Sequence, residues 1–170
     1  MQVLGGVPSP DPAPGSPISS LAGRDVGECA YSGCVHTTNY VNTFIEVAED
    51  CPVEHAVEPP ARGEPTIAEL HYSLIASAPY ARTSDDVVFE THALRAGITA
   101  EERDAARTAL FSKGQACLRS SPLGKRYGWG IHHDAEGRVR LIARDSDEYA
   151  RLAADPAISH VRAMRTSRAR

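Results

Sequence analysis

One helix-start signal occurs three times within a short part of the chain, at residues 66–69, 83–86 and 99–102. Each time a threonine is followed three residues later by an acidic residue. In this capping box the two residues satisfy each other's free backbone N–H groups at the beginning of a helix. Apolar residues at helical spacing follow each box, and Gly97 stands where the second helix would end. The sequence therefore predicts three successive helices, although residues 87–91 also fit a short strand.

Strand signals lie on both sides of this helical block. Residues 39–48 carry β-branched side chains at alternate positions, which indicates a half-buried strand. After a linker at 115–125, residues 126–133 and 138–143 alternate around a turn that ends in Gly137, as in a hairpin. Ser146 begins a further helix, and 158–164 fits a last strand. The predicted class is α+β, with the order β-ααα-ββ-α-β and a small antiparallel sheet that has helices packed on one face.

The composition is that of an ordinary globular protein, with 42% hydrophobic and 24% charged residues. The formal charge of −4 does not point to nucleic acid or to an anionic membrane as a partner. No apolar run approaches the roughly 20 residues of a membrane span, and the N-terminus lacks the pattern of a signal peptide. We therefore expect the four cysteines to be reduced and the protein to be cytoplasmic.

Residues 1–34 differ from the rest of the chain. They hold five prolines and six glycines, and their apolar residues follow neither strand nor helix spacing. Such a segment buries too little apolar surface to offset its chain entropy, so we expect it to be disordered. Residues 36–170 are predicted to form a single globular α+β domain.

Five blocks of this domain resemble a known family when taken together and in order. They are HTTNYVNTFIEVAEDCP, TSDDVVFE, SKGQACLR, KRYGWGIH and HVRAMR, which begin at residues 36, 83, 112, 125 and 160. The chain is similar to an uncharacterised bacterial and fungal family, domain of unknown function 6157. The resemblance covers nearly all of 36–170 and implies no activity, ligand or catalytic residue. Members of that family typically begin with Met directly before HTTNY, where this chain has Val35. Our hypothesis is that 1–34 reflects an upstream start assignment, which the intact mass of the native protein would test.

The candidate functional site is the stretch 112–133, which holds both lysines of a chain with 18 Lys and Arg residues. In a chain that otherwise uses Arg, a lysine can mark a position that needs a compact or titratable cation. Two ordinary surface lysines fit the pattern as well. The hypothesis is a pocket for an anionic small molecule, in a binding protein or an unidentified enzyme. Its candidate ligand-binding residues are Lys113, Arg119, Lys125, Arg126, Tyr127, Trp129 and His132.

Three residues of this stretch are candidates for catalysis: Lys113, Cys117 and His132. Cys117 with His132 or His133 could form a thiolate–imidazole pair, but a cysteine in these surroundings also fits a small buried hydrophobe. Two glycines, at 128 and 130, share one face of the predicted strand with His132. They indicate that a helix or a ligand comes close to the backbone there.

The sequence predicts no metal site and no cofactor. His132 and His133 face opposite sides of a strand and cannot chelate one ion together. The segment 124–126 lacks the upstream glycine and the following hydroxyl residue of a phosphate-binding loop. The alternative function is an interaction module that binds a protein partner or nucleic acid through a Tyr127/Trp129 face and the Arg-rich C-terminus. The excess of acidic residues disfavours nucleic acid, and an Arg-rich end also fits a solvated terminus.

Overall fold

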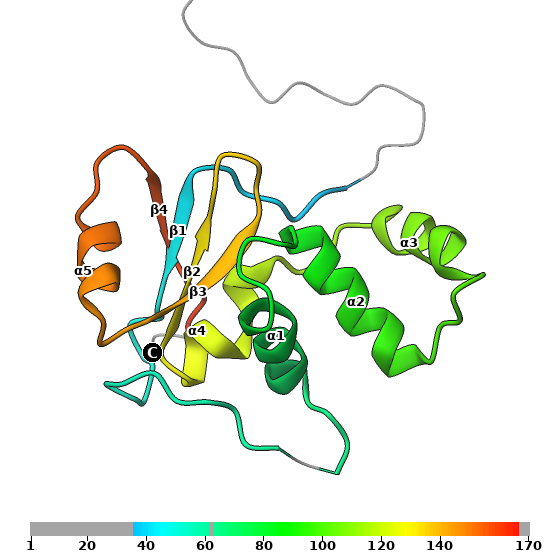
Figure 1. Ribbon diagram of the computed structural model, residues 1–170, viewed down its shortest axis with the longest axis horizontal. Coiled ribbons are helices and arrows are strands. Elements are labelled where there is room, and N and C mark those ends of the chain that lie inside the picture. The colour runs from blue at the N-terminus through cyan, green and yellow to red at the C-terminus, as the bar shows by residue number, and fades with distance from the viewer. Residues whose placement is uncertain (1–35, 62, 167–170) are drawn as a thin grey trace, which may run out of the picture. The chain divides into compact units, whose positions relative to one another are not determined.

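The computed structural model describes residues 36–61 and 63–166, so the predicted extension at 1–34 lies outside the described residues. Figure 1 shows the arrangement of the elements. The α+β class and the predicted order of helices and strands are confirmed. Two short helices, η1 and α4, are added in the stretch predicted as a linker; α4 includes Arg126, so the strand predicted from 126 begins only at Trp129. The elements are β1 (Thr43–Glu46), α1 (Ile67–Ala76), α2 (Ser84–Ala96), α3 (Arg103–Phe111), η1 (Leu118–Ser120), α4 (Pro122–Arg126), β2 (Trp129–His133), β3 (Val139–Ala143), α5 (Asp147–Ala153) and β4 (Ser159–Arg162).

The four strands form one sheet in the order β3-β2-β1-β4. Strand β2 is antiparallel to both β1 and β3, whereas β4 lies parallel to β1 with Ser159 opposite Thr43. The expectation of a purely antiparallel sheet is therefore wrong for β4. The reason is the connection through α5, which crosses from one edge of the sheet to the other and leaves β4 running in the same direction as β3 and β1.

Helices cover both faces of the sheet, and the expectation of helices on one face is also wrong. In Figure 1, α5 lies on the opposite side of the sheet from α1 and α2. Ile45 belongs to a core cluster with Ile75 of α1 and Val87 of α2. Its neighbour Phe44 points the other way, and its ring lies 5.0 Å from that of Tyr149 in α5. Because β1 is apolar on both faces, each face needs a covering helix.

The two glycines of the candidate stretch predict that another group lies close to the backbone of this strand. In the structure these groups belong to the protein itself. A Cβ atom on Gly130 would lie 2.7 Å from the Phe44 ring and 2.8 Å from Tyr149, so α5 occupies that space. Gly128 has φ +72°, and a Cβ there would lie 2.7 Å from the backbone oxygen of His55. Of the two explanations left open by the sequence, packing of a helix accounts for Gly130, and a loop accounts for Gly128.

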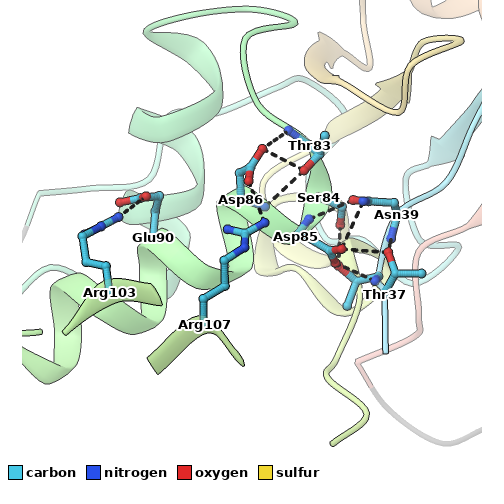
Figure 2. Close-up of polar contacts among 10 residues, drawn as sticks. Thr37, Asn39, Thr83, Ser84, Asp85, Asp86, Glu90, Arg103 and Arg107 are labelled. Atoms are coloured by element: carbon cyan, nitrogen blue, oxygen red, sulfur yellow. Dashed lines mark hydrogen bonds and ion pairs between the residues drawn. The ribbon is translucent and has the colours of Figure 1, made fainter. Parts of the chain in front are cut away.

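A polar network fixes the beginning of α2 (Figure 2). The Asp86 carboxylate accepts the backbone N–H of Thr83 at 2.9 Å, and the Thr83 hydroxyl accepts the N–H of Asp86, which completes the predicted capping box. The Asp85 carboxylate accepts the hydroxyl of Thr37 at 2.7 Å and the side-chain amide of Asn39 at 3.1 Å. The Asp85 backbone N–H donates in return to Asn39 at 2.9 Å. The network joins the segment before β1 to α2.

Ion pairs continue along α2 toward α3. Arg107 donates to Asp86 at 2.8 Å, and Arg103 pairs with Glu90 (Figure 2). The guanidinium groups of Arg103 and Arg107 also lie over the Phe89 ring, at 5.1 and 5.3 Å from its centroid. These contacts on one side of α2 define its direction, and thereby the place where its last turn lies.

Candidate functional site

Two adjoining hollows open where α1, α2 and the segment 115–127 meet. The inner hollow has a volume of about 320 Å³ and is lined by α1, α2 and residues 115–122. The outer hollow, of about 440 Å³, lies between the first turn of α1, the loop before it and the end of α4. Ile67, Arg95 and Pro122 line both. We call the pair the α1–α2 site; each hollow falls in the size range of small-molecule pockets.

A buried polar pair lies in the wall of the inner hollow. His71 of α1 and Ser121 are 7% and 2% exposed, and the His71 Nδ1 lies 2.9 Å from the Ser121 Oγ. Ser121 is fixed in turn as the N-cap of α4, where its Oγ accepts the backbone N–H of Leu123 at 3.3 Å. Burial lowers the pKa of His71 to about 4, so the imidazole is uncharged at neutral pH. The inner hollow therefore presents a neutral, well-oriented imidazole.

Two arginines border the outer hollow, Arg95 in the last turn of α2 and Arg126 in the last turn of α4. Both side chains are exposed, and in the described part of the chain neither makes a hydrogen bond or an ion pair. Arg103 and Arg107, by contrast, are both paired with acids. Glu64 is the acidic residue in this lining. Two unpaired guanidinium groups at one hollow provide charged donors for an anion.

The candidate stretch contributes to this site through only two of its predicted ligand-binding residues. Arg126 and Tyr127 line the outer hollow. Lys113 is exposed beyond the end of α3, and Lys125 lies half-buried on α4; neither lines the inner or the outer hollow. Arg119 lies on η1, where its Nε donates to the backbone oxygen of Arg162 at 3.0 Å. The predicted ligand-binding cations are thus dispersed.

The two remaining predicted ligand-binding residues hold the fold together. The Trp129 indole donates to the backbone oxygen of Val57 at 2.9 Å, and its ring lies 5.4 Å from that of Tyr72 in α1. His132 points toward the α5 side of the sheet, where its Nδ1 lies 2.8 Å from the Tyr80 hydroxyl. The sheet therefore separates His132 from the α1–α2 site.

Cys117 has a tyrosine as its partner. Its Sγ lies 3.4 Å from the hydroxyl of Tyr40, and in the described residues no hydrogen bond joins it to His132 or His133. Burial, followed by the contact with Cys117, raises the pKa of Tyr40, so its phenol stays protonated. The predicted thiolate–imidazole pair does not form; the thiol meets a neutral phenol.

Sequence reasoning missed His71 of α1 and Arg95 of α2, which line the inner hollow together with other residues of these two helices. A signal for His71 was available. It lies four residues after Ile67 and four before Ile75, on the inward side of a predicted helix. A histidine at such a position has to find a buried partner, which Ser121 supplies. Arg95 had no comparable signal, because its role depends on the absence of a partner in the folded chain.

Among the described residues, no group of three His, Cys, Asp or Glu side chains is placed to hold a metal ion. Within the same ranges, no helix has the length and apolar character needed to cross a membrane.

Comparison with known families adds a further observation. Residues 35–169 match the model of a family described as a family of unknown function, DUF6157. The chain belongs to this family. The match confirms the resemblance carried by the five sequence blocks, and it includes the whole α1–α2 site. Neither the comparison with curated proteins nor that with solved structures found a match. Membership of DUF6157 brings no activity with it, so the function has to be argued from the site.

Proposed function

We propose that the α1–α2 site binds a small anionic molecule, with the acidic group of the ligand between Arg95 and Arg126. The observation that carries this proposal is the pairing state of these arginines. Both line the outer hollow, and neither has an acidic partner in the described part of the chain. A carboxylate or a phosphate supplies the acceptor atoms that the planar guanidinium groups lack.

The charge balance of the protein supports this interpretation. The chain carries 22 acidic residues against 18 Lys and Arg, so acidic partners are plentiful. Two arginines that stay unpaired beside one hollow raise the local positive potential, which attracts anions into the site. The inner hollow behind Arg95 has room for the uncharged part of a small molecule.

We place this binding activity in the cytoplasm. The two described cysteines, Cys51 and Cys117, are both free thiols. A reducing compartment is the setting in which such thiols persist. The ligand on this proposal is therefore a soluble cytoplasmic metabolite with one acidic group.

Binding of named anions to the full chain tests the proposal. The probes are inorganic phosphate, levulinate and dihydroxyacetone phosphate, each with a single acidic group, measured by thermal denaturation and by calorimetry. Arg95→Gln and Arg126→Gln should each weaken binding about tenfold or more, because a hydrogen bond to a charged group contributes about 1.5–3 kcal/mol. The matched control is Arg151→Gln, an exposed arginine on α5. Equal loss in the control, or no binding of any probe to the wild type, would show the proposal to be wrong.

A further inference from the structure

A second inference concerns the inner hollow, and it rests on the proposed anion-binding function. We propose that His71 donates a hydrogen bond from Nε2 to an uncharged acceptor of the ligand, and that the Ser121 hydroxyl holds the imidazole in the tautomer this requires. His71 is then a specificity-determining residue for a ligand with an acidic group at one end and a neutral carbonyl at the other.

The tautomer follows from the hydrogen bonds of Ser121. Its Oγ already accepts the N–H of Leu123 as the cap of α4. The hydroxyl hydrogen still needs an acceptor, and at 2% exposure water does not provide one. In the described residues the remaining partner is Nδ1 of His71, at 2.9 Å. Nδ1 therefore accepts, and a neutral ring with an accepting Nδ1 carries its hydrogen on Nε2.

The Nε2–H group is available to a ligand. Among the described residues no protein group accepts from it, and the His71 side chain lines the inner hollow. His133 differs from His71, because both of its ring nitrogens are buried and have no hydrogen-bond partner in the described residues. Burial keeps the His71 ring uncharged at neutral pH, so it offers a dipole and not a charge.

The chemical character of Arg95 and of His71 defines the class of ligand. Arg95 and His71 line the same inner hollow, so one small molecule in it contacts both. An acidic group belongs at Arg95, which is exposed and charged. A second acidic group next to His71 would face a neutral imidazole and the uncharged side chains of Thr91 and Gln115, which also line this hollow, and it would gain no charged partner from them. The site therefore favours a monocarboxylate or a phosphate ester that carries an uncharged carbonyl over a dicarboxylate.

The first test measures the tautomer in the wild-type chain without any ligand. Long-range ¹H–¹⁵N NMR spectra of histidine-labelled protein at pH 7 should show His71 with the hydrogen on Nε2. Ser121→Ala should reduce this preference. Ser120→Ala is the matched control, because Ser120 also lines the inner hollow but donates to the backbone oxygen of Cys117. A hydrogen on Nδ1, or a charged ring, would overturn the inference while leaving the anion-binding proposal intact.

The second test uses levulinate, a carboxylate with a ketone near its far end, and pentanoate, the same chain without the ketone. The wild type should bind levulinate about fivefold or more tightly than pentanoate, as one hydrogen bond predicts. His71→Met should remove the difference. His71→Gln, which keeps an N–H donor at a similar reach, should retain part of it. Binding of both probes with equal affinity to the wild type would overturn the role of His71, whereas binding that is independent of Arg95 would overturn the proposed function.

Discussion

His133 provides the clearest quantitative test of the fold. It is completely buried in β2, between Thr43 of β1 and Val139 of β3, and the centroids of its ring and the Tyr40 ring lie 5.4 Å apart in a T-shaped arrangement. In the described part of the chain neither ring nitrogen has a hydrogen-bond partner. Burial lowers the pKa of His133 from 6.5 to about 4, and the adjacent His132 adds to this effect. We predict that His133→Leu stabilises the protein and reduces its sensitivity to acid.

The size of both effects follows from the burial. Leucine has a volume similar to that of histidine and no polar atoms. His133→Leu therefore removes two buried ring nitrogens that lack hydrogen bonds, and the free energy of unfolding should rise by about 1–3 kcal/mol. The acid effect comes from the difference between a pKa of 6.5 in the unfolded chain and about 4 in the folded one. As the pH drops below 6.5, His133 takes up a proton in the unfolded chain but not in the folded protein. The free energy of unfolding therefore decreases until the pH reaches the folded pKa of about 4. The total loss is about 3 kcal/mol.

The assay is urea unfolding of the wild type and His133→Leu between pH 7 and pH 4. His71 titrates in the same window and in the same direction, because burial lowers its pKa to about 4 as well. His133→Leu should therefore remove about half of the loss that the two histidines cause in the wild type. His92→Ala, at an exposed position of α2, is the control. A variant that is less stable at pH 7, or that loses stability with acid as steeply as the wild type, would refute the reasoning.

Two further substitutions test the packing of α2 and α5. Asp85→Asn should cost about 2–3 kcal/mol in unfolding free energy, because the carboxylate accepts four hydrogen bonds and an amide cannot; urea unfolding measures this, with the exposed Asp104→Asn as control. Gly130→Ala should cost about 1–3 kcal/mol, because its methyl group would lie 2.8 Å from Tyr149. Gly114→Ala is the control, because there is open space around Gly114. Gly130→Ala should lower the melting temperature, and Gly114→Ala should not.

The beginnings of the helices could be predicted where the signal is local. The boxes at 66–69 and 83–86 form with both of their reciprocal hydrogen bonds. At 99–102, the carboxylate of Glu102 accepts from the backbone and hydroxyl of Thr99, but α3 begins only at Arg103. The same sequence pattern closes a turn before the helix in this case. Whether a box continues into a helix depends on packing further along the chain.

The direction of β4 and the position of α5 could not be predicted in this way. Both depend on which edge of the sheet the chain reaches after β3, and no local pattern encodes that choice. One signal was available at Phe44 and Ile45, two successive large apolar residues in a strand. Such a pair requires that both faces be covered, and both residues are in fact fully buried.

The candidate site could be predicted only in part, because its residues come from three separated segments. The scarcity of lysine directed attention to Lys113 and Lys125, but neither lines the inner or outer hollow. A rare residue type shows that a position is unusual in composition, and it says nothing about which groups lie opposite it in the fold. What distinguishes Arg95 and Arg126 is that both lie without a partner at the same hollow in the described part of the chain, which only the folded chain reveals.

The position of Arg95 links the polar network to the proposed function. Arg95 lies in the last turn of α2, whereas Asp85 fixes the first turn of the same 13-residue helix. The last turn of α2 is held on one side only: Ala93 packs with Phe89 and Phe111, whereas Leu94 is 57% exposed and Arg95 has no partner in the described ranges. Loosening the helix at its first turn therefore shifts its far end relative to α1. Asp85→Asn should weaken anion binding although Asp85 lines neither hollow. Unchanged affinity in a folded variant would show that α1 and α4 alone hold the site in place.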